Sequence, residues 1–119
     1  MTPAEQLSDE QLVKAAAVEI MGWRYVHNTC RSGWLDPTSK RLRYPWNPLT
    51  DANDRDMVVE RMEEMGWSWR MESVWNEGQY YQVWFEDGKE WDITATADTP
   101  GRAVLIAALK AVRAEKGGE

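Results

Sequence analysis

One run of the sequence, residues 67–97, constrains the fold of this chain more than any other. Apolar and polar residues alternate along it with a period of two, which predicts β-strands that bury one face. Turn residues interrupt the alternation at the Asn-Glu-Gly of 76–78 and at the Asp-Gly of 87–88. The run therefore predicts three consecutive antiparallel strands over 67–75, 79–86 and 90–97.

Three segments outside this run carry the apolar periodicity of amphipathic helices. The first begins with a capping box, Ser8–Gln11, and ends at Gly22. The second begins within residues 50–53 and ends at Gly66. The third begins with proline at its first position, Pro100, and has a wide apolar face. These segments predict three helices.

The tripeptide Met-Gly-Trp occurs twice, ending at Trp23 and at Trp67. Glycine suits the left-handed position just past a helix end because it has no Cβ. The residue after it packs back on the last turn, which predicts that Trp23 lies over Val18 and Trp67 over Met62. Since a predicted strand follows each tripeptide, the repeat indicates two copies of a helix-to-strand corner rather than a binding element.

The segment between the first two helices, residues 23–46, holds short extended runs that predict two or three short strands. Pro45 and Pro48 then exclude regular helix. The order of elements predicts one α+β domain over residues 1–119, with a frayed tail at 115–119. The expected architecture is a compact α-β-α sandwich, in which three helices pack over a mainly antiparallel sheet.

The chain has eight tryptophans in 119 residues. Each indole can bury roughly 150–250 Å², so the core of a domain this small is expected to hold about half of them. The rest are expected to line a groove or an interface between protomers, which predicts a homo-oligomer. The candidates for this surplus are Trp69, Trp75, Trp84 and Trp91.

The net charge of −6 is unevenly distributed. Residues 24–46 carry five bases and one acid, whereas residues 51–98 carry thirteen acids and four bases. Phosphate repels an acidic chain, so general nucleic-acid binding is not expected. The basic segment could hold one anionic group, and the acidic segment could face a basic partner protein.

Cys30 is the single cysteine, so no intrachain disulfide is possible and a reducing, cytoplasmic location is expected. No apolar run approaches the roughly 20 residues that span a bilayer, and the N-terminus has no signal-peptide pattern. A membrane partner is therefore not expected.

Several features occur in a familiar order: the two helices ending in MGW, the WNPLTD segment, the aromatic hairpin and the final TPGRAVLIAALKAV helix. Together they resemble the phage ABA sandwich domain proteins over nearly the whole chain. The resemblance implies an α-β-α layered fold and a phage or prophage origin, and hence the cytoplasm of an infected bacterium. It carries no catalytic residue onto this chain, because the family is largely uncharacterised. The Trp-rich strand at 67–75 departs from the family pattern and marks a candidate partner surface.

Conventional metal and catalytic sites are not expected. The acids within residues 51–56 could suggest a calcium loop, but Asp56 stands where an EF-hand needs glycine, so helix capping is favoured. The only histidine, His27, is three residues from Cys30, and such residues on a strand point to opposite faces. A zinc site needs three or four ligands. We therefore expect no catalytic residue, no metal and no cofactor.

The segment RLRYPWNP, residues 41–48, combines cations with aromatic rings, a mixture that can stack a base and pair with a phosphate. The alternative is that its aromatic rings seal a sheet edge while its arginines are solvated. On the first interpretation, the candidate ligand-binding residues are Arg24, His27, Arg41, Arg43, Tyr44, Trp46 and Asn47.

A second candidate surface would bind a protein. It combines the acidic side of the second helix with surplus tryptophans: Glu60, Glu63, Glu64, Trp69, Trp75 and Trp84. The simpler interpretation of the three glutamates is a solvated helix face.

The leading hypothesis is a non-enzymatic phage accessory protein that binds, in its specific form a counter-defence protein that sequesters a small anionic, nucleotide-derived ligand. The alternative is an acidic inhibitor of a host defence protein. A small enzyme that uses His27 and Cys30 is the least favoured.

Overall fold

The computed structural model describes residues 2–27, 32–75 and 77–117. All three predicted helices form, and a short 3₁₀ turn precedes the first. Their bounds are η1 Ala4–Gln6, α1 Asp9–Ala15, α2 Ala52–Glu64 and α3 Pro100–Gly117, with a π-helical turn, η2 Ala16–Ile20, directly after α1. The strands are β1 Arg24–His27, β2 Ser32–Leu35, β3 Leu42–Arg43, β4 Ser68–Trp75, β5 Gln79–Glu86 and β6 Asp92–Ala97.

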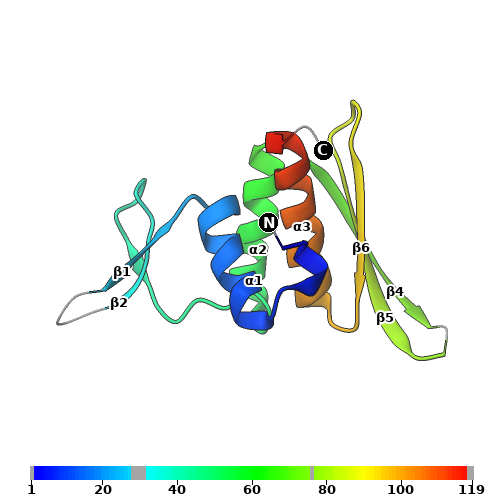
Figure 1. Cartoon of the computed structure of the whole chain (residues 1–119), viewed down its shortest axis with the longest axis horizontal. Coiled ribbons are helices and arrows are strands. Elements are labelled where there is room, and N and C mark those ends of the chain that lie inside the picture. The colour runs from blue at the N-terminus through cyan, green and yellow to red at the C-terminus, as the bar shows by residue number, and fades with distance from the viewer. Residues whose placement is uncertain (1, 28–31, 76, 118–119) are drawn as a thin grey trace.

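The described strands form two three-stranded antiparallel sheets, with the orders β1-β2-β3 and β4-β5-β6. We call them the small sheet and the large sheet. The expected α+β class, with antiparallel strands and three helices packed on them, is confirmed. The layering differs from the expected α-β-α sandwich, because the helices lie between the two sheets (Figure 1).

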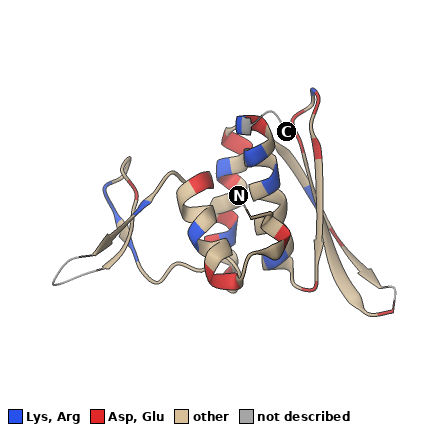
Figure 2. Cartoon of the chain, in the orientation of Figure 1, with Lys and Arg blue, Asp and Glu red and all other residues tan. Residues whose placement is uncertain are grey.

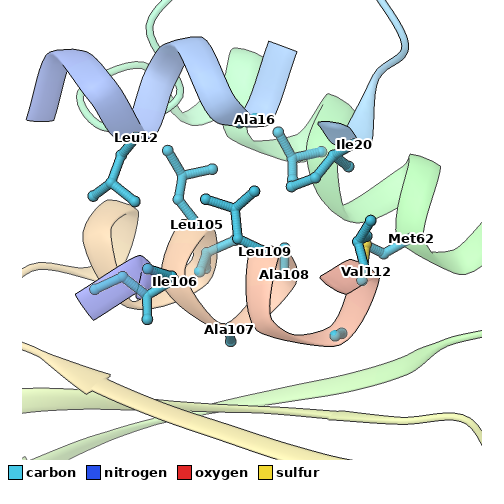
Figure 3. Packing of buried hydrophobic residues seen from close by; sticks show 14 of the residues in the cluster. Leu12, Ala16, Ile20, Met62, Leu105, Ile106, Ala107, Ala108, Leu109 and Val112 are labelled. Atoms are coloured by element: carbon cyan, nitrogen blue, oxygen red, sulfur yellow. The ribbon is translucent and has the colours of Figure 1, made fainter. Parts of the chain in front are cut away.

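The reason for this layering is the composition of α3. Ala103, Leu105, Ala107 and Leu109 are all fully buried, so this helix is apolar over most of its circumference and needs cover on two sides. It packs on β5 and β6 with one side and on α1, η2 and α2 with the other. Figure 3 shows Leu12, Ala16 and Ile20 reaching toward it from the side opposite the large sheet. The small sheet lies beyond α1 (Figure 1).

The two Met-Gly-Trp corners form as predicted, with one difference between them. Gly22 and Gly66 have φ values of +73° and +98°. The N–H of Trp67 donates to the Met62 carbonyl over 3.0 Å, as a helix C-cap requires. The N–H of Trp23 donates instead to the Ala17 carbonyl over 2.9 Å.

The first corner is shifted by one residue because the preceding turn is π-helical, which inserts an extra residue into the helical repeat. Val18 is consequently 47% exposed, although the sequence predicted that it lies under Trp23. That prediction was wrong, because the apolar spacing gives no sign of the wider turn.

The three predicted strands of the large sheet form, and the predicted alternation of their faces is confirmed. Trp69 pairs with Phe85, which pairs with Ile93, so these apolar residues share one face. The last strand starts at Asp92 rather than at the predicted Glu90. The Asp87 carboxylate explains this difference, since its Oδ1 accepts the N–H groups of Lys89 (2.9 Å) and Trp91 (3.1 Å) and extends the turn.

Candidate functional site

A groove of about 610 Å³ lies between α1 and the small sheet. We call it the aromatic groove. Helix α1 lines it with Asp9, Glu10, Val13 and Lys14. The opposite wall comes from the small sheet and the segment after it, and consists of Tyr25, Trp34, Trp46, Asn47 and Leu49. Its volume is in the range of small-ligand sites.

The aromatic wall is built by strand pairing. Tyr25 on β1 lies opposite Trp34 on β2, and their rings meet edge to face with centroids 5.2 Å apart. Gly33 allows the next strand to come close, because a Cβ there would lie 2.8 Å from the Arg43 carbonyl oxygen. Tyr25 is 51% exposed, whereas Trp34 is 9% exposed. In the aromatic groove, the accessible Tyr25 ring therefore packs against the buried Trp34 ring.

Trp46 and Asn47 continue this wall after β3. The Trp46 ring is 5% exposed and meets the Trp23 ring edge to face at 4.9 Å. The Asn47 side chain is engaged in a turn, because its Oδ1 accepts the Leu49 N–H over 3.0 Å. The Asn47 N–H donates to Oδ2 of Asp54 over 2.9 Å, which ties the wall to α2.

The polar rim of the aromatic groove carries two carboxylates and one ammonium group. Oδ1 of Asp9 pairs with the Arg102 guanidinium at 2.8 Å, while its side chain stays 77% exposed. Glu10 and Lys14 are exposed on the same helix. The rim is therefore not cationic, and it offers acceptors for a positively charged group.

The structure brings two of the seven predicted ligand residues, Trp46 and Asn47, to this groove. Arg43 is half-buried, with its guanidinium carbon 5.5 Å from the centre of the Trp23 ring. The other four, which are exposed and do not line the groove, are Arg24, His27, Arg41 and Tyr44. Nδ1 of His27 lies 2.7 Å from Oγ of Ser32. Figure 2 shows Lys and Arg positions along the strands and turns of the small sheet.

Neither Tyr25, Trp34 nor any residue of the first helix is among the site residues predicted from the sequence. Their proximity depends on the pairing of β1 with β2 and on the docking of the small sheet against α1. Neither follows from local spacing, so the only local signal for this wall was the aromatic character of the residues.

The residues of the predicted partner surface do not lie on one face of the molecule. Trp69 and Trp75 are 38% and 74% exposed and lie on the helix side of β4. Trp84 is half-buried on the opposite face, where the Arg70 guanidinium carbon lies 4.2 Å from its ring centre. Glu60, Glu63 and Glu64 are exposed on α2.

The acids at the start of α2 cap the helix as predicted. Oδ1 of Asp51 accepts the N–H groups of Asn53 (2.8 Å) and Asp54 (3.2 Å). Within residues 2–27, 32–75 and 77–117, no three His, Cys, Asp or Glu side chains gather into a set that could hold a metal ion. Cys30 lies outside the described residues, so the structure does not place it relative to His27.

In the described part of the chain, no helix combines the length and apolarity that crossing a membrane requires. Comparison with known protein families, curated proteins and solved structures finds no match for this chain. The resemblance to phage ABA sandwich domain proteins therefore stays a prediction.

Proposed function

We propose that this chain is a non-enzymatic binding protein whose aromatic groove accepts a short, cationic and partly apolar segment of a partner protein. The observation that carries this proposal is the combination of three aromatic side chains with two carboxylates around one groove. The proposal keeps the binding role expected from the sequence and moves the site from the exposed arginines to the groove.

The chemistry of the groove supports a peptide ligand. The accessible ring of Tyr25 offers a flat surface for a proline ring or for the alkyl stem of Lys or Arg. The carboxylates of Asp9 and Glu10 lie on the opposite wall, where a guanidinium or ammonium group would pair with them. Aromatic-lined grooves commonly bind extended segments that contain proline, and neighbouring carboxylates can pair with a base in the same segment.

Calorimetric titration with short peptides tests the proposal. Peptides that place Arg or Lys beside proline or leucine are expected to bind, and analogues with Glu in place of the base are not. Tyr25→Ala is expected to weaken binding about tenfold, the size of one truncated aromatic anchor. Glu10→Gln is expected to weaken binding less and to reduce its salt dependence.

Tyr44→Ala is the matched control, because Tyr44 is an exposed tyrosine near the same sheet that does not line the groove. Equal losses for Tyr25→Ala and Tyr44→Ala would contradict the assignment of the site. The absence of binding to every basic peptide would contradict the ligand class.

A second candidate ligand is the small anionic, nucleotide-derived molecule expected from the sequence. The observation that favours it is Arg43, whose half-buried guanidinium lies over Trp23 and whose Nε has no hydrogen-bond partner among the described residues. Thermal-shift measurements with cyclic and ADP-ribose-type nucleotides separate the two candidates. A nucleotide-dependent rise in melting temperature that is lost in Arg43→Gln would support the anionic ligand, and no rise with any nucleotide would exclude it.

The cellular setting belongs to the same proposal. On the resemblance to phage proteins, the partner is a host defence protein in the cytoplasm of an infected bacterium, and binding inhibits it. A basic partner would suit a chain with a net charge of −6.

A further inference from the structure

The two edge strands of the large sheet are protected to different extents. At β6, the carbonyl of Thr94 accepts a hydrogen bond from Nζ of Lys110 over 3.0 Å. Residues 2–5 also border a cavity with Ile93 and Lys110, so the N-terminal segment lies beside this strand. At β4, no described strand pairs on the side away from β5. The edge at β4 is therefore open.

Strand β4 also lacks three of the features that stop an edge from pairing with another chain, namely proline, lysine and a bulge. Its eight residues, Ser68–Trp75, include no proline and no lysine. All eight pair with β5 in one unbroken register, so no bulge twists the strand away. The strand is long and regular enough to act as a template for a further strand.

Apart from Ser73, the side chains of β4 that face the helix layer are apolar, and they are incompletely covered. Helix α3 packs on β5 and β6, and α2 reaches only part of β4. Trp69, Met71 and Trp75 are consequently 38%, 40% and 74% exposed. These three side chains extend the apolar face of the large sheet beyond its helical cover, which is costly in water unless another surface covers them.

The opposite face of β4 carries two charges, Arg70 and Glu72, on either side of Met71. The Arg70 side chain leans over Trp84 of β5, with its guanidinium carbon 4.2 Å from the ring centre. Along the strand, a base, Met71 and an acid therefore follow one another. Reversing the strand direction about Met71 exchanges the base and the acid.

We propose that β4 pairs antiparallel with β4 of a second copy of this chain, with Met71 opposite Met71, and joins the two large sheets into one. A two-fold axis through Met71 sets Arg70 of each copy opposite Glu72 of the other, so both charged pairs are attractive. It also sets Trp69 opposite Ser73 of the second copy, which places a large side chain beside a small one. If the pairing of the two β4 strands shifted by one residue, Arg70 and Glu72 of the second copy would lie on the opposite face of the joined sheet from Arg70 and Glu72 of the first.

This charge pattern is the reason for choosing a second copy as the occupant. When β4 pairs antiparallel with a second β4, both Arg70 and Glu72 lie opposite a residue of the other charge. A strand from a different protein would need an acid and a base at the same spacing to do this. The aromatic groove lies on the other side of the helices, between α1 and the small sheet (Figure 1). Pairing through β4 therefore leaves both grooves of the dimer open, and it does not depend on what the groove binds.

Light scattering coupled to size exclusion tests the proposal with charge reversals. The unmodified chain is expected to have the mass of a dimer. Arg70→Glu sets acids opposite each other in the dimer and Glu72→Arg sets bases opposite each other, so each variant alone is expected to shift to monomer. An equimolar mixture of the two variants restores both attractive pairs and is expected to regain the dimer mass.

Lys89→Glu, in the turn between β5 and β6, is the control charge reversal and is expected to remain dimeric. Far-UV circular dichroism checks that every variant is folded. A monomeric unmodified chain, or a dimer that survives both single reversals, would overturn the proposal. Failure of the mixture to recover the dimer would overturn the stated register.

A cross-link provides a measurement that does not depend on charge. Cα atoms opposite each other in an antiparallel pair lie about 4.5–5.5 Å apart, which a disulfide can bridge. In a Cys30→Ser background, Met71→Cys is expected to cross-link across the axis on mild oxidation. Ser73→Cys faces Trp69 of the second copy and is expected not to cross-link. Equal cross-linking of the two variants, or none for Met71→Cys, would contradict pairing centred on Met71.

Discussion

At the scale of single residues, the tryptophans fall into a buried group and a more exposed group, as their number suggested. Trp23, Trp34, Trp46 and Trp67 are buried, which confirms that the core holds about half of the eight. The buried ones stand at helix-to-strand corners or where the small sheet meets the helices. The exposure of the tryptophans in the large sheet depends on which strand and which face they occupy. Trp75, on the open edge, is therefore 74% exposed. Hydrophobicity alone does not distinguish the two groups.

Gly101 illustrates a residue that is required by close packing. It lies in the first turn of α3, and a Cβ there would overlap the Leu49 carbonyl oxygen and lie 2.7 Å from the Leu49 Cα. Gly→Ala within a helix ordinarily stabilises by about 0.5–1 kcal/mol. We expect Gly101→Ala to destabilise instead, by about 1–3 kcal/mol, because the backbone of Leu49 must move.

Urea unfolding followed by tryptophan fluorescence measures this change. Glu115→Ala, at an exposed position near the other end of α3, is the control and should alter the free energy of unfolding by less than about 0.5 kcal/mol. A Gly101→Ala protein as stable as the original would show that the linker before α2 is not held against α3.

At the scale of elements, the local sequence determines where most helices and strands begin and end. Ser8 and Gln11 form the predicted capping box, with hydrogen bonds of 2.9 and 3.2 Å between each side chain and the other residue's N–H. Asp51 caps α2, and Gly66 ends it in the left-handed conformation. The exception is the π-helical turn over residues 16–20. The capping and periodicity rules do not predict such a turn, which is rare and usually occurs singly within a helix.

The cap of α2 yields a prediction at this scale. Asp51→Ala removes the carboxylate that accepts two N–H groups and is expected to cost about 1 kcal/mol of unfolding free energy. Asp51→Ser keeps a capping oxygen and should restore most of this loss. Thermal unfolding followed by circular dichroism measures both variants. Asp56→Ala removes an exposed acid from the same helix and should have little effect; if it matched Asp51→Ala, general charge rather than capping would be responsible.

At the scale of the whole molecule, basic residues of α3 hold residues 5–19 of the chain against this C-terminal helix. Arg102 pairs with Asp9 at 2.8 Å, Lys110 with Glu5 at 3.1 Å and Arg113 with Glu19 at 2.9 Å. The last pair is bidentate, since Nη2 of Arg113 also donates to Oε2 of Glu19 over 2.9 Å. These contacts fix α1, and thereby one wall of the aromatic groove, relative to the core.

The Glu19–Arg113 pair makes part of the stability depend on pH. Hydrogen bonds from the Arg113 guanidinium hold the pKa of Glu19 below its usual value, against a smaller opposing effect of burial. A carboxyl whose pKa is lowered by folding stabilises the fold above its unfolded-state pKa and loses this contribution as the pH falls through its folded-state pKa. We expect Glu19→Gln to cost about 1 kcal/mol at neutral pH. The difference from the unmodified chain should shrink steadily below the ordinary glutamate pKa.

Urea unfolding at a series of pH values from neutral to acidic measures this difference. Glu115→Gln neutralises an exposed acid of α3 and serves as the control, with no comparable loss expected at neutral pH. A Glu19→Gln penalty that stayed constant across the series would indicate a packing effect rather than an ionic one.

Local sequence patterns predict the α+β class, the three helices, the three strands of the large sheet and the two Gly-Trp corners. Each of these depends on residues close together in the chain, where a period of two or 3.6, a capping side chain or a glycine fixes the local backbone. Three features could be learned only from the folded structure. The helices lie between two sheets, Tyr25 and Trp34 form a groove with Asp9 and Glu10, and the β4 edge is open. These features depend on which apolar surfaces meet across long separations, and burial is non-directional, so local patterns do not specify the partner.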